Sequence, residues 1–336
     1  MPSAAAAKKS SNYRDRVMTA WRLFTNYAYD FRRFRNASFI DGVRTRENRR
    51  AHIHLLAHML EYGMSLTDPR SGFGMDKVRM LAAETAKYMA DYGADETSDV
   101  GISVLAAYIA FNAGTASDAS EAQGLLDDLL EAGGSRSKPV VGGSEHVTSE
   151  DITRSSGIDF LSFMNARHSV RQYEKGAAVD PAKIERAVQA AMQSPSSCNR
   201  QTCRVYAFTE PTSIAKVLSH HSGNRGFGDQ LGGVFIVAVD LAHWNTIGER
   251  NQCWVDGGMF AMTLALGLHA EGLGTCMLNW SAARDQDRML RRCVGIPDNE
   301  VVITLMGFGH MRADFRVPVS RRKPLSLVLR TEPALT

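Results

Sequence analysis

The sequence predicts a helical N-terminal region followed by a C-terminal region that contains both strands and helices. Residues 13–132 show only the apolar spacing of helices, and strand-length apolar runs first occur beyond residue 200. Residues 133–150 are rich in Gly and Ser and lack periodicity, which is typical of a linker. We therefore expect disorder at 1–12, a helical domain at 13–132 and a second domain at 151–336.

The composition is that of a globular protein without an obvious polyanionic partner. Of the 336 residues, 44% are hydrophobic and 22% are charged, and the net charge is only +3. A charge this small gives no reason to expect nucleic-acid binding. No apolar run reaches the ~18 residues that a membrane span needs. The first residues also lack the apolar centre of a secretory signal, so we expect a cytoplasmic protein.

Cysteines and histidines give no clear metal or disulfide signature. The five cysteines are an odd number without a CxxC pair, so we expect buried, reduced thiols. His54, His58 and Glu61 follow one another at helical spacing and could share a face. The chain has no HExxH motif, and such residues more often serve packing or capping. We therefore predict no metal site.

The first predicted helix, residues 13–35, is basic and amphipathic. Val17, Trp21 and Phe24 fall on one face, and most of its arginines lie elsewhere. Such a helix can lie on an anionic membrane, or it can dock on its own protein and expose its arginines to water. We favour docking and leave peripheral membrane contact as the alternative. Similar periodicity predicts further helices at about 45–62, 76–92, 96–112 and 120–132.

A basic cluster, a helix, a polar loop and a strand follow one another in residues 166–208. The cluster has the sequence RHSVR at 167–171, and arginine forks match phosphate oxygens. Asp180 and Pro181 predict the start of the helix, because Asp is a good N-cap and Pro suits the first position. The loop SPSSCNRQ at 194–201 carries amides that suit the edge of a heterocyclic ring. Together they predict a site for an anion joined to a heterocycle.

The remaining chain alternates between helices and strands. Apolar runs predict strands at 204–208, 233–240 and 301–308, and a further strand after the Gly-rich turn at 272–274. Periodic segments predict helices at 213–218, 251–271 and 284–293.

The motifs RHSVR at 167–171 and PSSCNRQ at 195–201, followed by a strand, resemble the N-terminal signatures of the nitroreductase family of FMN-dependent oxidoreductases. The resemblance covers roughly residues 158–330. It implies an α+β, nitroreductase-like fold with an antiparallel-rich central sheet flanked by helices. It also implies an intertwined homodimer with FMN at the subunit interface. One departure is Thr202-Cys203, where the family usually has Pro-Trp, and it bears on local packing and substrate preference.

Three later segments extend the resemblance. Asp256-x-Gly258 matches the usual start of the long helix at the dimer interface. Gly272–Thr275 is similar to a segment whose following residues approach the flavin from the second subunit. The closing motif at 318–325 implies an arginine at the FMN phosphate, Arg321 or alternatively Arg322. The implied FMN-binding residues are Arg167, His168, Ser169, Arg171, Pro195, Ser196, Ser197, Asn199, Gln201, Leu278, Asn279 and Arg321.

The resemblance implies a flavin-centred enzyme without an acid/base dyad or a nucleophile of its own. A hydride would pass from NAD(P)H through flavin N5 to an unidentified small-molecule acceptor in a ping-pong mechanism. Arg171, or alternatively Arg167, would stabilise the negative charge of reduced FMN, and Arg167 with Arg321 would hold the phosphate. Two alternatives stay open. One is a specialised flavin dehydrogenation. The other is an accessory protein that acts through its helical domain, since residues 58–74 loosely resemble extensions found in polysaccharide biosynthesis.

Overall fold

The computed structural model describes residues 13–67, 70–113, 119–135 and 141–331. The disorder that we predict for residues 1–12 lies outside this range. Within the described ranges, no helix combines the length and the apolar character needed to cross a membrane.

The N-terminal region consists of helices, as the sequence predicts. Two of its helices, at Arg46–Met64 and Glu96–Asn112, begin at side-chain caps: Thr45 accepts the N–H of Asn48 at 3.1 Å, and Asp95 accepts that of Thr97 at 2.9 Å. The helices are α1 (Tyr13–Ala37), α2 (Arg46–Met64), α3 (Met75–Tyr92), α4 (Glu96–Asn112) and α5 (Ser120–Glu131). Helices α2 to α5 enclose a hydrophobic core of their own, formed by side chains that include Ile53, Leu60, Leu81, Ile102, Leu105 and Leu126.

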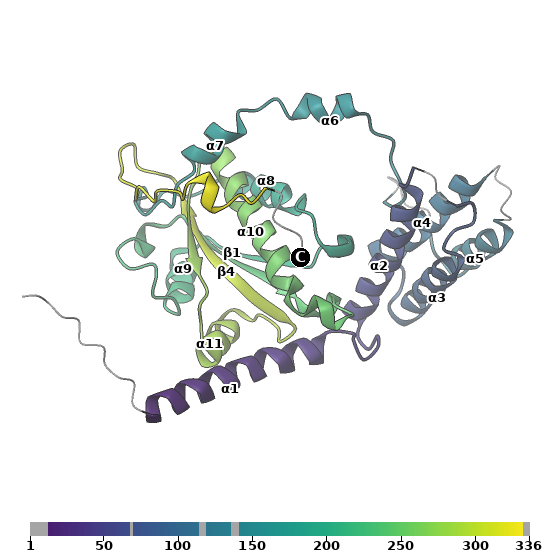
Figure 1. Cartoon of the computed structure of the whole chain (residues 1–336), viewed down its shortest axis with the longest axis horizontal. Helices are drawn as coiled ribbons and strands as arrows, with labels where there is room; N and C mark the ends of the chain where they lie inside the picture. Colours follow the sequence, from purple (N-terminus) through teal and green to yellow (C-terminus); the bar gives the residue numbers. More distant parts are fainter. Residues whose placement is uncertain (1–12, 68–69, 114–118, 136–140, 332–336) are drawn as a thin grey trace, which may run out of the picture.

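Helix α1 docks on the C-terminal region through polar residues. The N–H of Arg284 donates to Asn26 Oδ1 at 2.7 Å, and the Tyr29 hydroxyl donates to Asp287 at 2.9 Å. In contrast, Trp21 and Phe24 remain 61% and 63% exposed. The helix therefore packs along the lower side of the molecule in Figure 1 with its apolar face largely toward solvent. This orientation is opposite to the one expected for a docked amphipathic helix.

A four-stranded antiparallel sheet organises the C-terminal region. Its strands lie in the order β1-β2-β4-β3, and β3 is therefore an edge strand. Their bounds are β1 (Cys203–Phe208), β2 (Gly233–Asp240), β3 (Gly274–Asn279) and β4 (Glu300–Gly309). Every residue of β2 is buried, which explains its near-continuous apolar sequence. The predicted antiparallel-rich sheet is confirmed.

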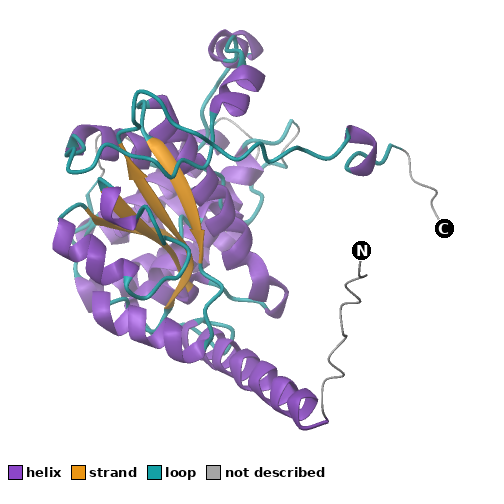
Figure 2. Cartoon of the chain, turned by 90° about the vertical axis from the view of Figure 1, so that its left-hand side faces the viewer, coloured by secondary structure: helices purple, strands orange, loops and turns teal. Residues whose placement is uncertain are grey.

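Helices cover both faces of this sheet. Phe235 packs among side chains of α8 (Pro181–Met192) and α10 (Gln252–Ala270), whereas Ile236 packs among those of α9 (Pro211–Leu218) and α11 (Arg284–Val294). Neighbouring residues of a strand point to opposite faces, so the two helix pairs form separate layers. The predicted α+β fold flanked by helices is therefore confirmed (Figures 1 and 2).

Two extended segments lie outside these layers. The chain between α5 and the sheet region arches over the molecule in Figure 1 and carries α6 (Ser149–Ser155) and α7 (Phe160–Ala166). At the other end, residues 318–331, which we call the C-terminal arm, leave the body of the molecule in Figure 2. The arm exposes apolar side chains, among them Val319 at 93% and Leu325 at 71%. No other described part of the chain covers these side chains.

Candidate functional site

The basic segment at 167–171 runs beside the edge strand β3. The N–H of Val170 donates to the carbonyl of Thr275 at 2.8 Å, and Ser169 pairs with Thr275 in a parallel bridge. Val170 is 2% exposed and belongs to the core below the sheet. This anchored valine places Ser169 and Arg171 beside β3, close to the start of the strand.

Arg171 meets the two predicted β3 residues in one cavity. We call it the β3-edge cavity; it has a volume of about 300 Å³. It is lined by Arg171, Leu278 and Asn279, together with neighbours that include His221, Cys276 and Trp280. Beyond the bridge between Ser169 and Thr275, no described strand pairs with the outer side of β3, so backbone groups there remain open to a ligand. The structure thus joins two predicted groups that are far apart in the sequence.

His221 is a cavity residue that the sequence did not indicate. Its Nδ1 accepts the N–H of Gly223 at 2.8 Å, so Nε2 carries the proton of the neutral ring and donates to the Asn279 carbonyl at 2.9 Å. The ring also stacks near Trp280, with centroids 6.1 Å apart. A single histidine in a Gly-rich loop gives no signal of its own, so only the fold identifies it.

The loop at 195–201 has an unusual backbone. Cys198, Asn199 and Gln201 have φ values of 51°, 50° and 49°, in the left-handed region. This region disfavours side chains by roughly 1–2 kcal/mol per residue, Asn being the best tolerated. Backbone strain of this kind clusters at functional sites, because the surrounding structure must hold it in place.

Two hydrogen bonds hold the strained loop. The N–H of Gln201 donates to Ser196 Oγ at 3.0 Å, and the N–H of Ser197 donates to Asp256 Oδ2 at 3.1 Å. Asp256 lies in the first turns of α10 and is 1% exposed. A second cavity of about 300 Å³, the loop cavity, lies beside these residues. Its lining includes Pro195, Ser196, Gln201, Arg204, Asp256 and Phe260.

Arg200 anchors the same loop from below. Its guanidinium forms an ion pair with Glu249 at 2.6 Å, donates to Asn245 at 3.1 Å and lies 5.3 Å from the ring centroid of Trp244. Only 3% of Arg200 is exposed. The loop motif implied FMN-binding roles for the neighbours of Arg200, but no role for Arg200 itself. Its role as an anchor follows from burial that the sequence does not reveal.

The two cysteines that line these cavities, Cys203 and Cys276, are not activated thiols. Burial raises the pKa of Cys203 to about 12, and the carboxylate of Asp256 acts in the same direction. Burial also raises the pKa of Cys276, although Arg171 opposes this effect. Both thiols therefore stay protonated at neutral pH, which agrees with the expected structural role.

Arg167 and His168 lie near the end of α10. They help to lower the pKa of His269 there, after burial as the main cause. The Nε of Arg167 is buried, and it has no hydrogen-bond partner among the described residues. Arg321 belongs to the exposed C-terminal arm and lines neither of the two cavities. Of Arg167, Arg171 and Arg321, only Arg171 therefore lines one of these two cavities.

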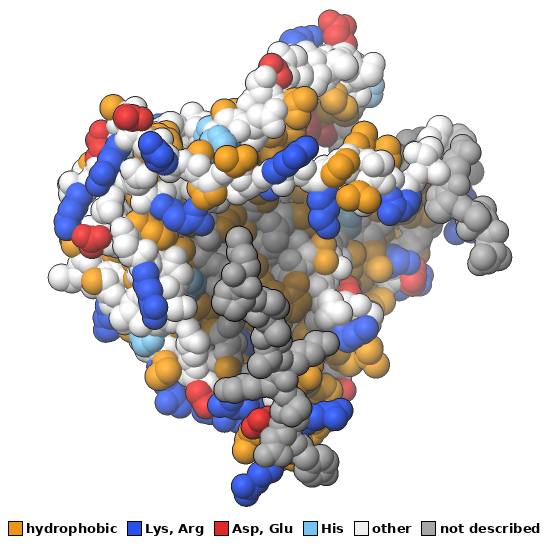
Figure 3. Space-filling model, turned by 60° about the vertical axis from the view of Figure 1, so that its left-hand side comes forward, with side chains coloured by type: hydrophobic (Ala, Val, Ile, Leu, Met, Phe, Trp, Pro, Cys, Tyr) orange, Lys and Arg blue, Asp and Glu red, His pale blue; other side chains and the backbone are white. Residues whose placement is uncertain are grey.

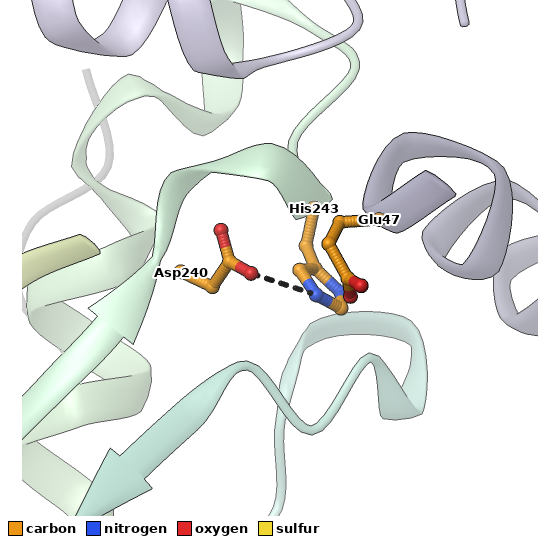
Figure 4. Close-up of side chains that lie close together, drawn as sticks. All are labelled: Glu47, Asp240 and His243. Atoms are coloured by element: carbon orange, nitrogen blue, oxygen red, sulfur yellow. Dashed lines mark ion pairs between the residues drawn. The ribbon is translucent and has the colours of Figure 1, made fainter. Parts of the chain in front are cut away.

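The structure also brings together three potential metal ligands that the sequence did not indicate. Glu47 lies in the first turn of α2, and Asp240 and His243 follow β2 (Figure 4). One ligand atom from each residue lies within 4.8 Å of the other two. The predicted helical group of His54, His58 and Glu61 does not form such a cluster in the described structure, where His58 pairs with Glu61 at 3.6 Å.

The C-terminal half of the chain has a nitroreductase-like fold, which a helical N-terminal region precedes. Residues 164–224 and 220–310 match the family model described as "Nitroreductase family". The C-terminal region of this chain therefore matches the nitroreductase family over residues 164–310, as its motifs implied. No curated protein matches the chain.

Solved structures similar to this chain resemble its C-terminal half. An NADH dehydrogenase/NAD(P)H nitroreductase from Parabacteroides distasonis is 20% identical, with 53% of this chain and 99% of that chain covered and a TM-score of 0.45. A nitroreductase in complex with FMN from Desulfovibrio desulfuricans is 20% identical, with 53% and 99% covered and a TM-score of 0.46. An NAD(P)H:FMN oxidoreductase from Staphylococcus epidermidis is 17% identical, with 52% and 95% covered and a TM-score of 0.46.

Proposed function

We propose that this protein is an FMN-dependent oxidoreductase that takes a hydride from NAD(P)H and reduces a small-molecule acceptor in a ping-pong cycle. The observation that carries the proposal is the β3-edge cavity, in which Arg171 meets Leu278 and Asn279 inside the region that matches the nitroreductase family. A cytoplasmic location is part of the proposal, and five unpaired thiols support it.

The residues present fit FMN in three respects. The unpartnered Nε of Arg167 and the guanidinium of Arg171 are donors suited to a phosphate or an anionic ring edge. Beyond the bridge at Thr275, the outer side of β3 is free of strand partners among the described residues and offers backbone groups to a flat heterocycle. The strained loop at 195–201 presents two amide side chains, Asn199 and Gln201, at positions where the backbone is held in the left-handed region.

Bound FMN would supply the hydride chemistry, and the chain's own residues would bind and orient it. Arg171 would favour negative charge at the ring edge that lies in the β3-edge cavity. His221 would keep the end of β3 in place through its bond to the Asn279 carbonyl. Asp256 would hold the loop by accepting the Ser197 N–H. None of these roles requires a protein nucleophile.

A homodimer would complete the site from two half-sites, and three features support this. The β3-edge cavity and the loop cavity have separate linings in one chain. The interface candidates Trp254 and Val255 on α10 are 47% and 52% exposed. The C-terminal arm extends away from the body of its own subunit (Figure 2). Hydrophobic and basic side chains are exposed along it, on the right of Figure 3. An arm of this kind suits a second copy.

The first test is spectroscopic. Purified full-length protein, reconstituted with FMN and freed of excess cofactor, is expected to be yellow and to elute as a dimer. Anaerobic addition of NADH or NADPH should bleach the visible flavin bands, and oxygen or an added acceptor should restore them. Failure to retain FMN would overturn the proposal. Retained FMN that neither nucleotide bleaches would instead favour an accessory protein or an enzyme with another reductant.

Deletion of residues 318–336 tests the role of the arm. We expect the truncated chain to fold, because the arm is exposed and contributes to neither sheet face. It should lose most of its dimer at micromolar concentration and bind FMN at least tenfold more weakly, as measured by light scattering and fluorescence titration. An Arg321→Ala variant separates the two effects, because it should keep the dimer and weaken only FMN binding. Unchanged FMN affinity in both proteins would exclude a cofactor role for the arm.

A further inference from the structure

A buried group of metal-binding side chains connects the helical region to the end of a central strand. Glu47 comes from α2, Asp240 is the last residue of β2, and His243 ends the short 3-10 helix η3 (Leu241–His243) that follows (Figure 4). One donor atom of each lies within 4.8 Å of the other two. The group lies outside both cavities described above.

His243 is the feature that calls for a ligand. The residue is only 5% exposed, and neither ring nitrogen has a hydrogen-bond partner within the described parts of the chain. A buried polar group left unsatisfied costs about 1–3 kcal/mol, so native proteins rarely keep one without a reason. A carboxylate oxygen, Asp240 Oδ2, lies 3.6 Å from His243 Nε2.

This distance fits a bridging metal better than a direct hydrogen bond. Hydrogen bonds to imidazole nitrogens have lengths of about 2.7–3.2 Å, so the measured gap is too long. Zinc bonds to imidazole and carboxylate at about 2.0–2.2 Å, and in tetrahedral geometry the two donor atoms lie roughly 3.3–3.5 Å apart. The observed separation of 3.6 Å between Asp240 and His243 is close to this value.

We propose that Glu47, Asp240 and His243 bind one Zn²⁺ ion, which joins helix α2 to the end of strand β2. Imidazole and carboxylate are both common ligands of zinc. The imidazole disfavours Mg²⁺ and Ca²⁺, because these ions prefer oxygen ligands alone. Three protein ligands leave a fourth position for water. Glu47 also lines a cavity of about 870 Å³, through which solvent reaches the group.

The ligands are held in place by contacts that do not involve a metal. Asp240 Oδ1 accepts the N–H of Ala242 at 2.9 Å and the amide of Asn299 at 2.8 Å, which leaves Oδ2 for the ion. Asn48, next to Glu47, donates to the Ala242 carbonyl at 2.8 Å and so fixes α2 against η3. Supporting hydrogen bonds of this kind orient metal ligands and raise affinity. Glu47 is 34% exposed at its side chain and can turn toward the ion.

The charges near the group allow a divalent cation. The two carboxylates carry two negative charges, which Zn²⁺ neutralises beside a neutral imidazole. Arg50 lies 3.4 Å from Glu47 Oε1, and Arg204 lies 4.0 Å from Asp240 Oδ2. Both arginines contact a carboxylate and neither contacts the imidazole. The competing arrangement is an imidazolium ion between two carboxylates, which would bind no metal.

The test measures metal binding by the full-length protein and is independent of flavin. After removal of metal with EDTA, we expect one equivalent of Zn²⁺ per chain by competition with a chromophoric chelator. Co²⁺ should give the visible absorption of a tetrahedral site with nitrogen and oxygen ligands. His243→Gln and Glu47→Gln should each weaken Zn²⁺ binding by more than the roughly 10- to 100-fold that loss of a supporting hydrogen bond costs. Zn²⁺ should also raise the Tm of the unmodified protein.

A matched control is available on the same helix. His58 and Glu61 form a histidine–carboxylate pair that is also 3.6 Å apart, but the His58 side chain is 39% exposed. His58→Gln should leave Zn²⁺ affinity unchanged. The Glu47→Gln variant should fold even if His243→Gln does not, because the Glu47 side chain is partly exposed. The proposal would be overturned, in favour of an imidazolium pair, if the unmodified protein had no stoichiometric Zn²⁺ site. The same holds if the Glu47→Gln and His243→Gln variants bound Zn²⁺ as tightly as the unmodified protein.

Discussion

Two FMN-defective variants of this chain are expected to restore half of the FMN sites when they are combined in one dimer. The first variant, Arg171→Ala, removes the cation of the β3-edge cavity. The second, Asn199→Gly with Gln201→Gly, removes both loop amides but keeps the backbone, since glycine accepts the φ values of 50° and 49° found there. This expectation rests on the proposed function, in which each site takes one cavity from each subunit.

The single variants should both bind FMN poorly. A hydrogen bond to a charged group contributes about 1.5–3 kcal/mol, so Arg171→Ala should raise the Kd roughly 10- to 150-fold. Two neutral amide bonds at about 0.5–1.5 kcal/mol each give a comparable loss of roughly 5- to 150-fold. In the mixed dimer, one site collects both defects and the other contains none.

Co-expression with two affinity tags isolates the mixed dimer for titration with FMN. We expect one site per dimer at the affinity of the unmodified protein. If each site were built within one chain, both sites of the mixed dimer would be defective, and no tight binding would return. Arg186→Ala is a suitable control, because Arg186 pairs with Glu271 on the surface, away from both cavity linings. Its FMN affinity should not change.

Replacement of Arg200 is expected to cause the largest loss of stability. Arg200→Ala removes a guanidinium that is 3% exposed and leaves Glu249 without its 2.6 Å partner. Breaking a buried ion pair on one side typically costs 3–5 kcal/mol, because the remaining charge stays buried without compensation. We therefore expect the free energy of unfolding to fall by about 3–5 kcal/mol, measured by urea denaturation.

The Arg186–Glu271 pair again provides the comparison. Its geometry is equally good, at 2.7 Å, but the Arg186 side chain is 53% exposed. Exposed pairs contribute about 0–1 kcal/mol, so Arg186→Ala should have little effect on unfolding. Similar losses in the two variants would mean that burial of Arg200 is not what makes its ion pair important. Arg200→Ala should also weaken FMN binding, since the strained loop depends on this anchor.

Local patterns in the sequence were sufficient to place most secondary structure. Strand β2 was predicted with its observed bounds, because seven consecutive apolar or small residues before Asp240 are typical of a buried strand. Helix α4 likewise begins after the Asp95 cap and ends near Asn112, as expected. The loop at 195–201 was also located by its composition. Its strained backbone was not, because φ values depend on how neighbouring elements hold the chain.

The candidate sites divide in the same way. The motif at 167–171 pointed to Arg171, and the Gly-rich turn before β3 pointed to Leu278 and Asn279. Their meeting in one cavity required the bridge between Ser169 and Thr275, which only the folded chain contains. His221 joins them through a contact across many residues. The position of Arg321 on an exposed arm could also not be predicted, since its motif does not indicate in which direction the chain runs after the last strand.

The sequence by itself determined the order of helices and strands, the family of the C-terminal region and the residues suited to a phosphorylated ring. These features depend on side-chain type and short-range spacing, which the amino-acid sequence contains in full. The tertiary structure decided which of those residues share a cavity, how α1 turns its apolar face outward, and that Glu47 meets Asp240 and His243. Contacts between distant segments follow from the packing of whole elements, and no local pattern records them.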